Sequence, residues 1–290
     1  MEIKEYEDKV KNILIEKINS LIDSLSRDFK KNYNKKENNW ILGDFDEKII
    51  SNMVFVSTFE SKSGNMMENI ATDIIKIKLG ENNVPLILKG ANISDEEYNN
   101  FVNGHIKGGK NAQGIISKFD LKECKKIASR FREDNRGQDR QNSSLDQQKL
   151  YQIIKDKPKI TDIITFKPVD LIYLKDGKIN LMEIKAGGDL DSSNAPGNID
   201  KMFTWVAMLG KECNLYFSTL YHKDGEGNLW KGGIKKFLGN DMILIGKQFW
   251  EEILPDGINF DTFKKLYFEA CSEVNLNKKM TNLIKSVISE

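Results

Sequence analysis

Hydrophobic residues recur at steps of three and four through the first thirty positions, as Val10 and Leu14 illustrate. This spacing is typical of a long amphipathic helix with one apolar face. A second helix is predicted near Asp46–Phe59, and after a turn at Ser61–Gly64 a third helix runs to Leu79. The N-terminal half of the chain is therefore expected to be rich in helices.

The middle of the chain mixes short elements with polar connections. A short strand is predicted at 84–90 and a capped helix at 94–104, and the glycines of 104–114 indicate a loop. A basic helix near Asp120–Asp134 then leads into the polar stretch 135–148.

From about Ile160 the pattern changes to short apolar runs rich in β-branched and aromatic residues, which favour strands. A helix at Ile199–Leu209 interrupts these runs, and three further helical patterns close the chain. Strands are predicted at 164–174, 178–186, 214–221 and 241–246.

Helices followed by a mixed sheet with helices indicate an α/β or α+β fold, in which a central mixed β-sheet is flanked by helices. At 290 residues the chain is long enough for one large domain or two unequal ones. We expect a helical region over 1–150 and a core with C-terminal helices over 151–290, and the two could form one integrated domain.

Composition narrows the class of protein. Charged residues make up 30% of the chain and hydrophobic residues 39%, a balance typical of folded soluble proteins. No apolar run reaches the roughly 18 residues of a membrane span. The three cysteines match no disulfide framework and no zinc-site spacing. We therefore expect a cytoplasmic protein that does not enter a membrane.

The net charge of +1 excludes a uniformly basic DNA-coating protein, so any nucleic-acid surface must be local. Four of the five arginines (Arg130, Arg132, Arg136 and Arg140) lie within one short segment. Arginine forks to the O6 and N7 atoms of guanine, whereas lysine binds phosphate as a point charge. These arginines therefore predict DNA base reading; the alternative is a solvated helix end neutralised by neighbouring acidic residues.

The best-defined chemistry lies in a predicted hairpin. Asp176-Gly177 separates two apolar runs and favours a two-residue type I′ turn. That turn would place Asp170 directly opposite Glu183, with Lys185 on the same face as Glu183.

Opposed like charges destabilise a sheet unless a cation lies between them. Mg²⁺ suits this position, because it is a hard ion that takes carboxylate and water oxygens as ligands. With Lys185 beside it, such an ion would provide an activated water for attack on a phosphodiester. The alternative interpretation is a surface hairpin whose charges are solvated, but both of its faces carry large apolar residues.

The order of Asp170 and then Glu183-Ile184-Lys185 resembles the motif of the PD-(D/E)XK nuclease superfamily, although Val169 separates Pro168 from the aspartate. The continuation 183–198 is similar to type II restriction endonucleases, in particular to a small group that cuts GGNCC-type sites. The resemblance covers roughly 161–221.

The resemblance implies a restriction-endonuclease-like core over about 160–250 and a Mg²⁺-dependent enzyme that cuts both strands of DNA at a specific sequence. Asp170 and Glu183 would be metal ligands and Lys185 a further catalytic residue. Many members add an acidic residue from an early helix, for which Glu68 is the candidate; a partly exposed glutamate at a helix start is the alternative.

Other expectations concern DNA and partners. Asn194 and Asn198 would contact DNA phosphates, or else cap the following helix. A twofold homodimer would match a palindromic DNA site, and the resemblance implies a DNA methyltransferase as genetic partner. Two alternatives remain open: a repair or recombination nuclease that selects DNA shape, and a DNA-binding module without catalysis.

Overall fold

The computed structural model of the protein describes residues 3–105, 113–135, 159–187 and 194–288. The chain forms two compact units. We call Met1–Lys78 with Ile253–Glu290 the helical unit, and Leu79–Glu252 the core unit. In the described ranges, no helix combines the length and apolar character needed to cross a lipid bilayer.

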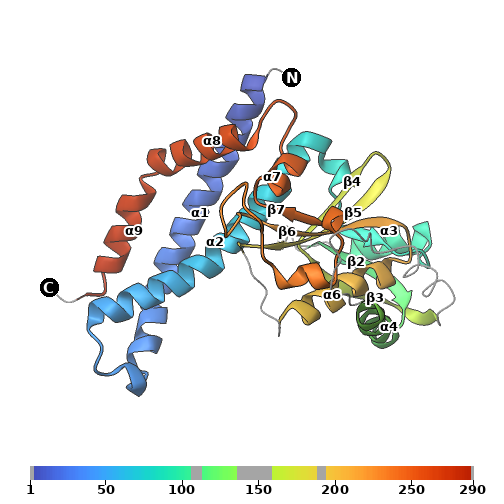
Figure 1. The fold of residues 1–290 in the computed structure, drawn as a ribbon, viewed down its shortest axis with the longest axis horizontal. Helices are drawn as coiled ribbons and strands as arrows, with labels where there is room; N and C mark the ends of the chain where they lie inside the picture. Colours follow the sequence, from blue (N-terminus) through green and yellow to red (C-terminus); the bar gives the residue numbers. More distant parts are fainter. Residues whose placement is uncertain (1–2, 106–112, 136–158, 188–193, 289–290) are drawn as a thin grey trace. The chain divides into compact units, whose positions relative to one another are not determined.

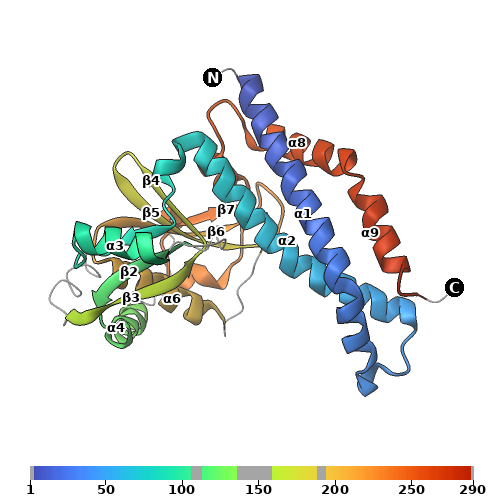
Figure 2. The same ribbon diagram turned by 180° about the vertical axis from the view of Figure 1, so that it is seen from behind.

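The helical unit is built from long amphipathic helices. α8 and α9 pack along α1, whose buried stripe includes the predicted Val10 and Leu14 (Figure 1, Figure 2). The ion pairs Lys17–Asp73, at 2.8 Å, and Lys62–Asp28, at 2.6 Å, join α1 and α2 in antiparallel order. The elements are α1 (Ile3–Glu37), η1 (Trp40–Leu42), α2 (Glu47–Leu79), α8 (Phe260–Glu273) and α9 (Leu276–Lys285).

The turn predicted at Ser61–Gly64 is wrong, because α2 continues through it as one helix. A glycine in a helix interior costs about 1 kcal/mol relative to alanine. Here the buried face of the helix continues across Gly64, with Thr58 and Met66 both buried, and the Lys62–Asp28 ion pair holds the same turn against α1. Tertiary packing therefore outweighs the local signal for a break.

The core unit contains two mixed sheets where one central sheet is predicted. The first has the order β1-β2-β3, with β1 parallel and β3 antiparallel to β2. The sequence pattern does not predict β2, because it is buried on both faces and shows no alternation of apolar and polar residues. The elements are β1 (Ile87–Lys89), α3 (Asp95–His105), β2 (Gln113–Phe119) and β3 (Lys159–Val169).

The second sheet has the order β4-β5-β6-β7 and contains the predicted hairpin. β4 and β5 pair antiparallel, with Leu171 opposite Met182 and Lys175 opposite Lys178, which confirms the predicted register. Asp176 and Gly177 both have positive φ, as a type I′ turn requires. The strands are β4 (Leu171–Lys175), β5 (Lys178–Lys185), β6 (Cys213–Thr219) and β7 (Ile243–Ile245).

One buried side chain links the two sheets. The amide of Gln113, at the start of β2, accepts a hydrogen bond from the Ile172 N–H at 2.7 Å and donates to the Ile172 carbonyl at 2.9 Å. It also donates to the Pro85 carbonyl at 2.7 Å. Gln113 thus supplies β4 with the backbone-like partner that the edge of a sheet otherwise lacks.

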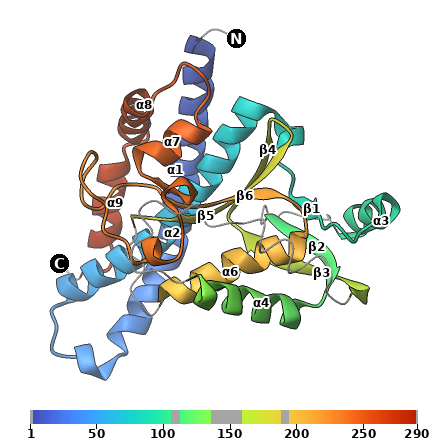
Figure 3. The same cartoon turned by 45° about the vertical axis from the view of Figure 1, so that its right-hand side comes forward.

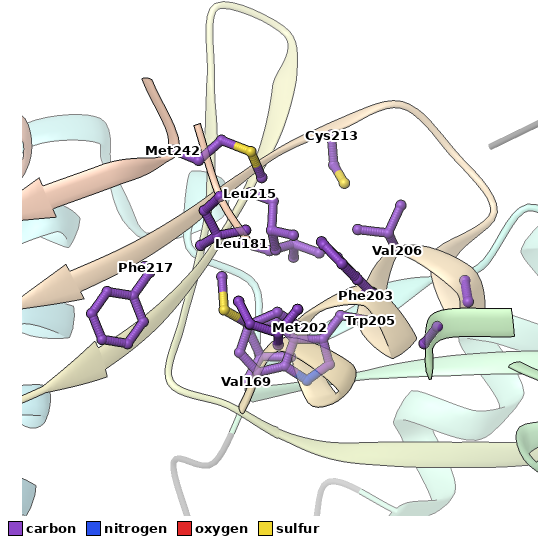
Figure 4. Close-up of a cluster of buried hydrophobic side chains, with 14 of the residues drawn as sticks. Val169, Leu181, Met202, Phe203, Trp205, Val206, Cys213, Leu215, Phe217 and Met242 are labelled. Carbon is purple, nitrogen blue, oxygen red and sulfur yellow. The ribbon is translucent and has the colours of Figure 1, made fainter. Parts of the chain in front are cut away.

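Helices α4 and α6 lie side by side along the core unit (Figure 3). α6 is apolar over most of its circumference and buries its side chains against β2 and β6 (Figure 4). The N-cap of α4 is Asp120, which accepts from the Glu123 N–H at 3.0 Å. The remaining elements are α4 (Leu121–Asp134), α6 (Asn194–Leu209), α7 (Lys247–Ile253), η2 (Glu81–Asn83), η3 (Gly233–Lys236) and η4 (Asn240–Met242).

The structure confirms the predicted fold class, a mixed α/β protein with a helix-rich N-terminal half. Its compact units differ from the predicted division into 1–150 and 151–290. The core unit takes in β1, β2 and α4 from the first half of the chain, because β2 pairs with β3 and α4 packs on α6. The C-terminal helices α8 and α9 join α1.

The link between the sheets makes a testable prediction. Gln113→Leu leaves the Ile172 N–H and carbonyl buried without partners, which we expect to lower the free energy of unfolding by about 1–3 kcal/mol. Urea unfolding followed by circular dichroism measures this. Gln248→Leu is the control, since Gln248 is exposed and accepts one bond, from the Ile245 N–H at 3.3 Å. Equal losses in the two variants would contradict the role of Gln113.

Candidate active site

Asp170 lies where the chain passes from one sheet to the other. Val169 pairs with Gln113 in the first sheet, and Leu171 pairs with Met182 in the second. Between them, Asp170 Oδ2 accepts a hydrogen bond from the Ile184 N–H of β5 at 2.9 Å. The side chain of Asp170 is 10% exposed. Because the chain passes from one sheet to the other at this residue, the carboxylate lies beside β5, where the Ile184 N–H holds it.

Glu183 lies on β5 between two neighbouring strands, with β4 on one side and β6 on the other. Its carboxylate is fully buried, on the same face of the sheet as Leu181 and Phe217. The hairpin register carries Asp170 to the position opposite Glu183, as the sequence predicts. Two acidic side chains are thus brought together in the interior of the core unit.

Two lysines contact this pair. Lys185, the last residue of β5, forms an ion pair with Glu183 Oε1. Lys201, from α6, places its Nζ 2.6 Å from Glu183 Oε2 and 3.7 Å from Asp170 Oδ1. The ammonium of Lys201 also lies 5.1 Å from the centre of the Trp205 ring, a cation–π distance. The cluster therefore combines two carboxylates with two ammonium groups.

The pKa of Asp170 reflects the burial and the charges of the pair. Burial raises the pKa of this carboxyl to about 7, from an ordinary value of 3.8, and the negative charge of Glu183 raises it as well. Lys201, the hydrogen bond from Ile184 and Lys185 act in the opposite direction. The net result is that a second negative charge beside Glu183 is unfavourable without a further cation.

The residues present fit a divalent metal ion. Glu183 Oε1 is buried and accepts no hydrogen bond from the described part of the chain, although the ammonium of Lys185 lies within ion-pair range. A buried carboxylate oxygen of this kind is suited to ligating a hard cation. Within the described ranges, no group of three or more His, Cys, Asp or Glu residues forms a metal cluster. Mg²⁺ is usually held by one or two carboxylates with water, so Asp170 and Glu183 are sufficient in number.

The arginines of α4 differ in their surroundings. Arg132 Nε donates to Asp200 Oδ1 of α6 at 2.7 Å, and its guanidinium lies 5.9 Å from the Phe237 ring centre. With a side chain 12% exposed, Arg132 links α4 to α6 in this structure. Arg130 is exposed and lines a groove with Lys122 and other basic residues of α4. Arg130 is therefore accessible where Arg132 is engaged, and the DNA contact predicted for both residues stays a prediction.

Other predicted residues fall in different places. Asn194 and Asn198 form the first turn of α6, where Asn198 Nδ2 donates to the Asn194 carbonyl at 3.0 Å. Glu68 lies on α2, in the helical unit, and its participation in the site stays a prediction. Arg136 and Arg140 lie outside the described residues.

Lys201 is the site residue that the sequence analysis missed. Its position on α6 carries a signal, because Lys201 shares a stripe with Trp205 and Met208, at steps of four and three, and both are fully buried. A lysine on a buried stripe needs an anionic partner. The sequence analysis predicts this helix but not that it is buried on more than one side, as α6 is in the structure.

The fold and this cluster define a hydrolytic class: a buried carboxylate pair with lysines, at the end of a hairpin in a mixed sheet, suits metal-assisted cleavage of a phosphodiester. The family model for the type II restriction endonuclease HinfI matches residues 3–271. The chain belongs to the HinfI family of type II restriction endonucleases, which makes it a site-specific deoxyribonuclease with DNA as substrate. Such enzymes generally need divalent metal ions. No curated protein and no solved structure matches the chain.

The family match confirms the predicted type II restriction endonuclease. It covers both compact units, and so reaches well beyond the segment 161–221 on which the resemblance rests. The similarity to the group that cuts GGNCC-type sites is not tested by this match and stays a prediction.

The raised pKa of Asp170 predicts a pH-dependent gain in stability for Asp170→Asn in EDTA. The wild-type carboxyl is penalised when ionised, so the penalty is complete above pH 7 and disappears as the pH falls towards 4. We expect the variant to be more stable by about 1–4 kcal/mol at pH 8 and to lose this advantage by pH 4. Urea unfolding at several pH values measures the difference, and a constant difference would contradict the assignment.

Proposed function

We propose that the protein is a Mg²⁺-dependent endonuclease that cuts both strands of DNA at a specific sequence, with Asp170 and Glu183 as metal ligands. The observation that carries the proposal is the buried pair of carboxylates at the junction of the two sheets. Burial of two adjacent like charges is unfavourable, and a divalent cation would relieve it with the ligands that Mg²⁺ prefers.

Each residue of the cluster has a distinct task in this proposal. Asp170 would offer Oδ1 to the ion, because its Oδ2 is held by the Ile184 N–H. Glu183 would offer a carboxylate that the strand fixes in place. Lys185, 31% exposed, would orient the attacking water and stabilise charge on the phosphate. When bound, Mg²⁺ supplies an activated water and neutralises negative charge that develops during phosphodiester hydrolysis.

DNA binding would use the basic groove of α4. Lys122, Lys125 and Lys126 follow one side of this helix, and Arg130 lies about one turn further along. The lysines would hold backbone phosphates, and Arg130 would read a base edge. Arg136 and Arg140 remain candidates for the same role. Asn194 and Asn198, at the start of α6, would add phosphate contacts.

The wider setting follows from the activity. A homodimer would bring two clusters to the two strands of a symmetric site. A DNA methyltransferase that protects the same site would be the genetic partner, and the cytoplasm the place of action. Glu68 would add a third carboxylate to the metal site, as the resemblance implies.

The test of the proposal is digestion of one plasmid of known sequence with Mg²⁺ and with EDTA. Discrete bands that require Mg²⁺, with ends that map to one recurring sequence, are the expected result. A smear, or cleavage only of branched DNA, would favour a nuclease that selects DNA shape. Binding without any cleavage would favour a DNA-binding module without catalysis.

Loss of either carboxylate should abolish cleavage while DNA binding survives. We expect Asp170→Ala and Glu183→Ala each to lower the cleavage rate by about a hundredfold or more, since metal assistance contributes several kcal/mol. Plasmid cleavage in Mg²⁺ measures the first effect, and a mobility shift in Ca²⁺ measures the second. Either variant cutting near the wild-type rate would refute the metal site.

Lys185→Ala serves as the comparison. It should also fail to cut, yet it should still bind Ca²⁺, because a charged lysine has no lone pair for a metal. Loss of Ca²⁺ binding as severe as in Asp170→Ala would contradict the task given to Lys185.

Base reading by Arg130 predicts a selective loss. We expect Arg130→Ala to weaken binding to the specific site by about 1–3 kcal/mol, with a much smaller effect on random DNA. Lys122→Ala should weaken both DNAs alike and reduce the dependence of binding on salt. Mobility shifts in Ca²⁺ on both DNAs, at several salt concentrations, test this. Equal losses on both DNAs for Arg130→Ala would make the groove an electrostatic surface only.

A further inference from the structure

Lys201 is placed where a cation shared by the two carboxylates belongs. Its Nζ contacts Glu183 Oε2 at 2.6 Å and approaches Asp170 Oδ1 at 3.7 Å. The other oxygen of Asp170 is occupied by the Ile184 N–H, and the other oxygen of Glu183 lies beside Lys185. Oδ1 and Oε2 are thus the oxygens that one cation bridges, and in this structure that cation is Lys201.

The surroundings hold Lys201 at this position. α6 is anchored one residue earlier, where Asp200 accepts from Arg132 at 2.7 Å and from Ser129 at 2.9 Å. One helical turn later, the Trp205 ring lies under the ammonium at 5.1 Å. The side chain remains 26% exposed, so it has room to withdraw towards solvent. The lysine is therefore held in place but is not locked into the interior.

When both carboxyl groups are ionised, the charges of the cluster balance without a metal. Asp170 and Glu183 then carry two negative charges, and Lys185 and Lys201 carry two positive charges. A divalent ion added to this set would leave an excess of positive charge. Its ligand from Asp170 would be Oδ1, which Lys201 approaches, and its ligand from Glu183 would belong to the carboxylate that Lys201 contacts, at the roughly 2.1 Å typical of Mg²⁺. Two cations cannot share these oxygens at full strength, because they repel each other at this separation.

We propose that Lys201 is an internal counter-ion that a divalent metal displaces. In the metal-free protein it neutralises the carboxylate pair and keeps the site folded. When the metal binds, the ammonium leaves Oδ1 and Oε2 and moves towards solvent. Lys201 thereby weakens metal binding and sets the metal concentration at which the site fills. This inference rests on the metal site of the proposed function.

The test compares the full-length wild-type protein with Lys201→Gln, using Ca²⁺ as the probe. Isothermal titration should show Ca²⁺ affinity about tenfold higher in the variant, a typical size for coupling between two binding events. Its thermal midpoint in EDTA should fall, because the carboxylates lose a counter-ion, and saturating Ca²⁺ should restore it. If Lys201 had only a structural role, its substitution would lower metal affinity and stability together.

Lys235→Gln is the matched control. Lys235 also lies over a tryptophan ring, 5.6 Å from the centre of Trp230, but it belongs to η3 and not to the carboxylate cluster. Its substitution should leave Ca²⁺ affinity unchanged. A rise in affinity in both variants would reduce the effect to one of net charge and overturn the proposal.

A second measurement uses the wild-type chain alone, and so holds even where Lys201→Gln fails to fold. Acetylation of lysines by a soluble reagent, read by mass spectrometry, should become faster at Lys201 when Ca²⁺ is added and stay constant at Lys235. Unchanged or slower labelling of Lys201 would overturn the displacement.

The two proposals fail in different ways. Equal or weaker Ca²⁺ binding by Lys201→Gln, with clear binding by the wild type, overturns the role of Lys201 and leaves the metal site intact. Absence of Ca²⁺ and Mn²⁺ binding in both proteins overturns the metal site and the role of Lys201 together.

Discussion

The core unit is organised around the burial of two carboxylates side by side. Such a pair is unstable in an apolar interior unless cations and hydrogen bonds compensate it. Asp170 is compensated by the Ile184 N–H and Glu183 by two ammonium groups. Ile184 and Lys185 belong to β5 and Lys201 belongs to α6, so the cluster is complete only when β5, the junction at Asp170 and α6 are all in position.

The junction between the sheets explains why the acidic pair can be so close. A continuous strand from 164 to 174 would carry Asp170 within a regular ladder. Instead the chain leaves the first sheet at Val169 and enters the second at Leu171. Gln113 closes the gap with both ends of its amide on Ile172. The irregularity of the backbone at Asp170 is thus the means by which its carboxylate turns towards β5.

The sequence predicts those parts of the site that depend on local rules. The turn at Asp176-Gly177 fixes the hairpin register, and the register fixes Asp170 against Glu183. Lys201 could not be placed in the same way, because its contact with Glu183 depends on how α6 packs against the sheets. The same is true of Arg132. Its charge is evident from the sequence, but its partner Asp200 is known only from the tertiary structure.

The ion pair between Arg132 and Asp200 has a geometric consequence. It ties α4, which carries the basic groove, to α6 one residue before the lysine of the carboxylate cluster. The distance between the groove and the cluster is therefore fixed. If a nucleic acid backbone binds on α4, that distance would determine which phosphate along the strand reaches the carboxylates.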